Sequence, residues 1–127
     1  MKTLVIVHTE SSIRESLSYL FRNEGYTVHG AGDVGLALEL CRSEQPHVVI
    51  TGLSAQWVQG NALDLVPVLR REFPSLVIVT LSGDGAKGTV DRAKSMGATH
   101  HFYTPIHFPD VLNVVRLVAP NEADPTL

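Results

Sequence analysis

The chain has 127 residues, of which 44% are hydrophobic and 18% are charged. This length predicts a single domain, and the apolar share excludes a disordered chain. A net charge of −3 argues against a nucleic-acid binder, which is usually basic. The single cysteine cannot form an internal disulfide, and no apolar run approaches the ~20 residues of a membrane span. Because residues 1–3 lead into a strand-like segment without a signal-peptide pattern, we expect a cytoplasmic domain.

Short runs rich in Val, Ile and Leu alternate with segments of helical periodicity. The continuous apolar character of the runs predicts strands that are buried on both faces of a parallel sheet. These predicted strands are residues 4–7, 26–28, 48–50, 76–79 and, more weakly, 99–103. Apolar side chains at helical spacing predict helices in the segments after each strand: residues 13–21, 34–41, 61–73, 86–93 and 111–118.

Five strand–helix units in succession predict a doubly wound α/β sheet with right-handed crossovers. We expect this domain to occupy residues 1–119 and a short polar tail to occupy residues 120–127. Gly25 and Gly97 stand where left-handed helix ends are expected, and Asp33 is a predicted helix N-cap. Pro67 falls inside a helical segment, so we expect that helix to begin late, near Asp64, with the proline in its first turn.

The segment from residue 3 to about residue 119 resembles the receiver domain of response regulators, the phosphoacceptor module of bacterial two-component signalling. The resemblance rests on the frame of residues 4–7, 13–15, 25–28, 48–50, 69–70, 82–83, 97–98 and 105 together with Pro46 and Gly60. It implies a flavodoxin-like (βα)5 fold with strand order 2-1-3-4-5. It also implies a site at the carboxyl ends of the strands, where open α/β sheets bind ligands.

The residues at that site depart from the family pattern. Receivers carry an acidic pair after the first strand, and here the two positions are His8 and Thr9, with Glu10 left of the acidic cluster. The phosphorylated Asp of the family corresponds to Gly52, and its Lys corresponds to Thr104. Because an acyl phosphate requires a carboxylate nucleophile and Mg²⁺ requires oxygen ligands, we expect no phosphorylation of the family's kind. Loss of the acids together with the Lys leaves a nearly neutral pocket.

Three further positions follow the family frame. Ser82 keeps the family's hydroxyl, and we favour a strand-end serine that caps its turn over a ligand-sensing role. His101 stands at the family's aromatic switch position; a partly exposed strand histidine is favoured over a pH-sensitive switch. Pro105 corresponds to the proline that follows a cis peptide bond in the family, and we expect that bond to be cis here.

Metal and phosphate sites are not expected elsewhere. The six histidines lack the partners of a structural zinc site, and the adjacent His100 and His101 point to opposite faces of a strand. The glycine-rich residues 83–88 lack the ending of a phosphate-binding P-loop and are interpreted as a flexible loop. Trp57 is either an interface anchor or a side chain that folds over the pocket, and both interpretations stay open. We therefore expect no metal and no cofactor.

The sequence thus predicts a degenerate receiver, or pseudo-receiver, that is not an enzyme and acts through a protein partner. Homodimerisation stays open, and no contact with nucleic acid or membrane is expected. The expected contact face spans residues 86–119, as is common in the family. Two alternatives remain. The first is phosphorylation at a non-standard residue (Thr51, Ser54, Glu10 or Asp84), and the second is a small-molecule binder or enzyme that uses His8, Ser82 and His101.

Overall fold

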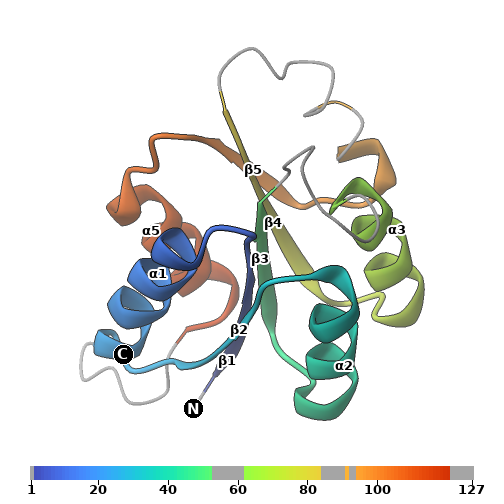
Figure 1. Ribbon diagram of the computed structural model, residues 1–127, viewed down its shortest axis with the longest axis horizontal. Helices are drawn as coiled ribbons and strands as arrows, with labels where there is room; N and C mark the ends of the chain where they lie inside the picture. Colours follow the sequence, from blue (N-terminus) through green and yellow to red (C-terminus); the bar gives the residue numbers. More distant parts are fainter. Residues whose placement is uncertain (1, 53–61, 84–90, 92–93, 121–127) are drawn as a thin grey trace.

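The computed structural model describes residues 2–52, 62–83, 91 and 94–120. Its centre is a sheet of five parallel strands in the order β2-β1-β3-β4-β5 (Figure 1). The strands are β1 (Thr3–Val7), β2 (Thr27–Ala31), β3 (Val48–Gly52), β4 (Val77–Ser82) and β5 (His100–Tyr103). This order and the parallel pairing confirm the fold class predicted from the sequence.

Helices cover both faces of the sheet (Figure 1). One face carries α1 (Ser11–Asn23) and α5 (Phe108–Val118), and the other carries α2 (Val34–Glu44) and α3 (Ala62–Glu72). Residues 94–96, just before β5, are also helical. The arrangement leaves the carboxyl ends of the strands together at one edge of the sheet, where a site is expected.

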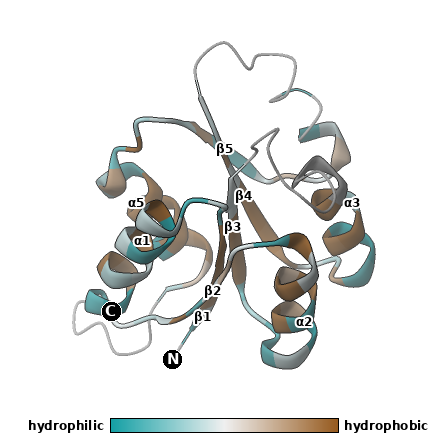
Figure 2. Ribbon diagram, viewed as in Figure 1, coloured by the Kyte–Doolittle hydropathy of each residue, from teal (hydrophilic) through white to brown (hydrophobic). Residues whose placement is uncertain are grey.

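The three inner strands, β1, β3 and β4, are largely apolar because each contributes side chains to two cores. Figure 2 shows hydrophobic strands at the centre of the molecule and hydrophilic residues mainly on helices and turns. Full burial of one large aliphatic side chain contributes about 1.5–3 kcal/mol. The core under α2 and α3 includes Val5, Val7, Val49, Leu65, Leu69 and Ile78. The core under α1 and α5 includes Leu4, Ile6, Phe21, Ile50, Val111 and Val115.

Most of the predicted helix ends are confirmed. Gly25 and Gly97 have φ values of 93° and 125°, and Asp33 accepts a hydrogen bond from the Leu36 N–H at 2.8 Å. The left-handed end of α2 at Gln45, with φ of 47°, was not predicted. Its N–H donates to the Cys41 carbonyl, and the following Pro46 disfavours a further helical residue at this position.

The expectation for Pro67 was wrong. The helix α3 already includes Ala62, and the proline lies in its interior rather than in its first turn. A proline there removes one backbone hydrogen bond and costs about 3 kcal/mol. Leu65, Val66 and Leu69 are completely buried on either side of it. Burial of this apolar face offsets the local cost, so tertiary packing overrides helix propensity.

Candidate functional site

The carboxyl ends of β1, β4 and β5 enclose a small cavity. Its volume is about 250 Å³, and its lining residues are His8, Glu10, Ile13, Leu81, Ser82, Gly83 and Thr104. Three of the residues expected in this pocket (Glu10, Ser82 and Thr104) therefore line it, together with His8. Thr9 is half-buried and is not among the lining residues.

The backbone and the ring of His8 are both fixed by hydrogen bonds. Its N–H donates to the Ala31 carbonyl at 3.1 Å, and its carbonyl accepts from Arg14 Nη1 at 2.7 Å. Its ring Nδ1 accepts from the Glu10 N–H at 3.1 Å. Burial lowers the pKa of His8, and the nearby Arg14 acts in the same direction, whereas Glu10 opposes them. The ring is therefore a neutral acceptor at neutral pH.

Gly52, at the end of β3, lies directly against this ring. A Cβ atom built on Gly52 would be 2.6 Å from His8 Cδ2 and 3.0 Å from His8 Nε2. Real Cβ atoms essentially never approach a neighbour so closely, so the ring takes the space that any side chain at position 52 would need.

Ser82 and His101 are hydrogen-bonded across β4 and β5. Ser82 Oγ lies 2.9 Å from His101 Nε2, and Thr80 Oγ1 lies 2.7 Å from His101 Nδ1. The ring also packs edge-on against Tyr103, with centroids 5.1 Å apart. Burial lowers the pKa of His101, and Lys94 lowers it further. The interpretation of Ser82 as a simple turn cap did not include this bond to His101.

Thr80 was missed by the sequence analysis, although a signal for it exists. It stands two residues before Ser82 and therefore shares its face of β4. The strand register pairs Thr80 with His101 and Ser82 with Tyr103. Both hydroxyls thus flank the histidine, a relationship that follows from the parallel pairing once the register is known.

Thr104, directly after β5, lines the small pocket, and Pro105 follows it. The Thr104 N–H donates to the Ser82 carbonyl at 2.7 Å, and the Thr104 hydroxyl approaches the same carbonyl at 3.4 Å. The peptide bond between Thr104 and Pro105 is cis, as expected.

Comparison with known proteins assigns the chain to one family. The model of the response regulator receiver domain matches residues 4–116. This chain belongs to that family.

Two curated relatives of this receiver domain are named as regulatory proteins. It is 28% identical over 124 residues to the photosynthetic apparatus regulatory protein RegA of Rhodobacter capsulatus, with 98% of this chain and 65% of RegA covered. It is also 28% identical over 107 residues to the nitrogen assimilation regulatory protein NtrX of Azorhizobium caulinodans, with 82% of this chain and 23% of NtrX covered. The chain thus spans less than two thirds of either relative.

Solved structures share the fold. The receiver domain of NtrX from Brucella abortus superposes with a TM-score of 0.85 at 23% identity, covering 91% of this chain and 96% of that one. A response regulator receiver domain protein from Clostridium thermocellum gives 0.86 at 18% identity, covering 93% and 94%. At this level of identity the likeness concerns the architecture alone.

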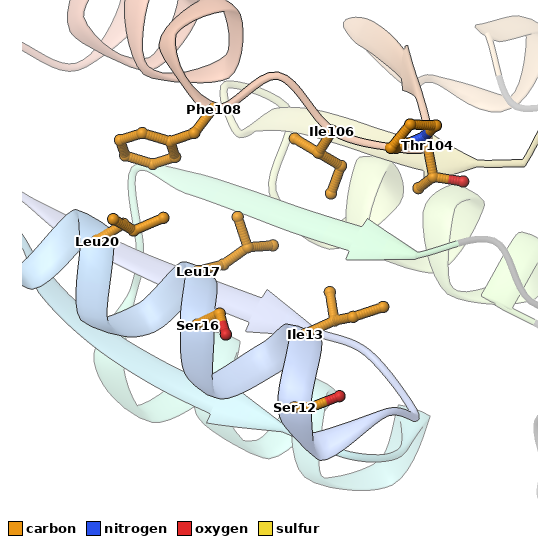
Figure 3. Close-up of a pocket in the computed structure, with 9 residues that line it drawn as sticks. Ser12, Ile13, Ser16, Leu17, Leu20, Thr104, Ile106 and Phe108 are labelled. Carbon is orange, nitrogen blue, oxygen red and sulfur yellow. The ribbon is translucent and has the colours of Figure 1, made fainter.

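A second, larger cavity of this receiver domain was not predicted from the sequence. Its volume is about 410 Å³, and it lies between α1 and the connection from β5 to α5. Figure 3 shows Leu17 and Leu20 of α1 facing Ile106 and Phe108 across it. Ile13 and Thr104 line both cavities, so the apolar groove adjoins the small polar pocket.

Several sequence predictions fall outside the described residues: Ser54, Trp57, Asp84, the rest of the glycine-rich loop after Gly83 and the tail after Pro120. Of the other two candidate phosphoacceptors, Thr51 is completely buried, and its hydroxyl donates to the Gly52 carbonyl at 3.3 Å. Glu10 is exposed at the start of α1.

The part of the chain that the structure describes contains neither a cluster of metal ligands nor a membrane-spanning helix. In residues 2–52, 62–83, 91 and 94–120, no three His, Cys, Asp or Glu side chains are grouped as metal ligands would be. No helix within these ranges has the length and apolar character to cross a membrane.

Proposed function

We propose that this receiver domain is a pseudo-receiver, which does not take up a phosphoryl group at the usual position and transmits signals through contacts with a protein partner. The observation that carries the proposal is the placement of the His8 ring against Gly52. The ring occupies the space in which a phosphoacceptor side chain at position 52 would lie. This packing leaves no room for a reactive side chain at position 52.

The chemistry of the neighbouring residues supports the same function. Gly52 offers no nucleophile, and formation of an acyl phosphate needs a carboxylate. Among the residues that line the small pocket, Glu10 is the one carboxylate, whereas Mg²⁺ takes oxygen ligands and is usually held by carboxylates. Thr104 is neutral and supplies no positive charge to phosphoryl oxygens.

The partner-binding face proposed here is residues 86–119, by analogy with the family. In its described part, Tyr103 on the edge strand β5 is 47% exposed and Leu117 on α5 is 82% exposed. In this proposal, these two side chains belong to the partner contact. A second copy of the chain is one partner that this face would fit.

Titration with beryllofluoride and Mg²⁺, followed by amide chemical shifts, tests the proposal. We expect no saturable shift at Gly52 or Ser82, and no mass gain after incubation with a small phosphodonor. Saturable shifts at these two residues would overturn the proposal. A mass gain without them would instead favour a non-standard phosphoacceptor.

A positive control can be built from the same chain. The variant His8→Asp/Thr9→Asp/Gly52→Asp/Thr104→Lys restores the acidic pair, the phosphoacceptor and the cation together. It is expected to bind beryllofluoride with Mg²⁺ under the conditions in which the parent chain does not. The His8 substitution is needed in this set because the ring would otherwise collide with the new side chain.

Sedimentation over a range of concentrations tests the contact face. Self-association that Tyr103→Ser weakens would assign the face to a homodimer. Leu36→Ser is the matched control, because Leu36 is 40% exposed but lies on α2, which packs on β1 and β2, away from the edge strand β5. Equal weakening by both variants would argue against this face.

A further inference from the structure

Three polar side chains form a continuous chain of hydrogen bonds behind the small pocket. Thr80 Oγ1 lies 2.7 Å from His101 Nδ1, and His101 Nε2 lies 2.9 Å from Ser82 Oγ. All three belong to the paired strands β4 and β5, with Thr80 directly opposite His101 in the register. Two neighbouring strands of one sheet therefore hold the whole arrangement.

One of the two possible arrangements of these hydrogen bonds leaves His101 Nε2 as an acceptor toward Ser82. The Thr80 hydroxyl donates its proton to the His100 carbonyl at 3.4 Å. With this proton given to the carbonyl, the hydroxyl oxygen is left to accept, and the matching tautomer of His101 carries its proton on Nδ1 and donates to Thr80. The other ring nitrogen, Nε2, is then a bare acceptor toward the Ser82 hydroxyl. This is the tautomer that a histidine needs to withdraw a proton from a serine.

Ser82 stands between this histidine and the cavity. It is 4% exposed and lines the 250 Å³ pocket, whereas His101 is not among the lining residues. Ser82 thus contacts the pocket, and its hydroxyl is hydrogen-bonded to the base at 2.9 Å. The lowered pKa of His101, caused by burial and by Lys94, keeps the ring unprotonated at neutral pH.

We propose that Ser82 is an acylation site, at which the hydroxyl takes an acyl group from a small ester. Ser82 Oγ forms a bond to the acyl carbon, and the Ser82 proton moves to His101 Nε2. The bond between the acyl carbon and the alcohol oxygen of the ester then breaks, and the departing oxygen takes that proton from His101. Thr80 is a positioning residue, since it acts by holding the ring in the required tautomer.

p-Nitrophenyl acetate is the probe for this reaction. The expected result is one acetyl group per chain, located at Ser82 by peptide mass spectrometry, with release of one p-nitrophenol. Ser18 is an internal control, because it is also 4% exposed but its hydroxyl donates to the Arg14 carbonyl and has no histidine behind it. Ser18 is expected to stay unmodified, and Ser82→Ala is expected to abolish the labelling.

Substitutions at the other two positions separate a chemical role from a structural one. His101→Phe keeps a ring against Tyr103 but removes the base, and loss of general-base assistance is expected to slow acetylation about 10²- to 10⁴-fold. Thr80→Val is expected to give an intermediate rate, and Thr80→Ser, which restores the hydroxyl, to recover the parent rate. The rate in the parent chain is expected to fall as the pH is lowered below the pKa of His101, and His101→Phe is expected to lose this dependence.

Three results would overturn the proposal. The first is acetylation of Ser82 at the same rate in His101→Phe as in the parent chain. The second is labelling that spreads over several serines and lysines, Ser18 included, at similar rates. The third is no labelling of Ser82 at all in the parent chain. If His101→Phe does not fold, the comparison of Thr80→Val with Thr80→Ser decides between the outcomes.

Discussion

The imidazole of His8 lies against the α-carbon of Gly52, so that a Cβ on that glycine would stand 2.6 Å from His8 Cδ2. Gly52 ends β3, His8 directly follows the neighbouring strand β1, and the two residues complement each other in size. A side chain at position 52 and the ring in its observed place exclude each other. We therefore expect the effect of a substitution at position 52 on the free energy of unfolding to depend on the residue at position 8.

The first prediction concerns this pair. Gly52→Ala is expected to destabilise the domain by about 1–3 kcal/mol, the usual cost of overpacking a well-filled site. His8→Ala in the same chain removes the ring, so the double variant is expected to lose less stability than the sum of the two single variants. Urea unfolding of the four proteins measures the coupling.

Gly83→Ala is the control for the Gly52 substitution. A Cβ at position 83 would meet Thr104 Oγ1 at 3.7 Å, which is an ordinary contact. Its effect is expected to stay within about 0.5 kcal/mol, as for most substitutions that disturb no special feature. A Gly52→Ala variant as stable as Gly83→Ala would mean that the His8 ring moves aside at little cost.

A second prediction concerns Gly97, at the turn before β5. Its φ is 125°, and a Cβ there would lie 2.9 Å from both Cβ and Cγ of Arg70. The Arg70 guanidinium donates to the Gly97 carbonyl at 2.8 Å and to the Pro74 carbonyl at 2.8 Å, which ties the end of α3 to this turn. Gly97→Ala therefore combines backbone strain of about 1–3 kcal/mol with a steric clash.

The expected outcome for Gly97→Ala is a lower midpoint of urea unfolding with little change in slope. Arg70→Ala should not rescue it, because the Arg70 Cβ remains in place and the strained φ is independent of the arginine. Recovery of full stability in the double variant would contradict the strain argument.

The third prediction concerns pH. Burial holds the pKa of both His8 and His101 below the ordinary value of 6.5. Below that value the unfolded chain binds more protons at these two positions than the folded chain does, so stability rises with pH there. The contribution of both groups is complete above about pH 6.5 and is lost as the pH falls toward the folded-state pKa values.

Urea unfolding between pH 7.5 and pH 5 measures this effect. The parent chain is expected to weaken as the pH falls, and the variant His8→Asn/His101→Asn is expected to have a shallower dependence over the same range. An unchanged slope in the double variant would assign the dependence to other groups.

The fold was predictable from the sequence because its signals are local and strong. Continuous Val, Ile and Leu runs at residues 4–7 and 48–50 indicate strands buried on two faces, and Gly25 and Asp33 mark helix ends by their own chemistry. The site was predictable only as a set of positions. The direction of the His8 ring depends on its hydrogen bond from the Glu10 N–H, which composition and spacing do not encode.

The hydrogen bond between Ser82 and His101 was predictable only in part. Both residues were singled out, but the bond between them depends on the strand register, and its direction depends on Thr80. The apolar groove beside α1 could not be predicted, because it forms where residues about 90 positions apart, such as Leu17 and Ile106, face each other. Contacts of this kind arise only from the completed fold.

The last prediction concerns Pro67, where local propensity and packing disagree. The proline interrupts the hydrogen-bond ladder of α3, whereas Leu65, Val66 and Leu69 keep the helix on the sheet. Pro67→Ala adds the missing N–H and removes the clash with the preceding turn, so it is expected to stabilise the domain by up to about 3 kcal/mol. Urea unfolding measures the gain, and Pro74→Ala, just beyond the end of the helix, is the matched control. A Pro67→Ala variant that is no more stable than the parent chain would contradict this prediction. It would mean that the backbone of α3 accommodates the proline without a loss of stability.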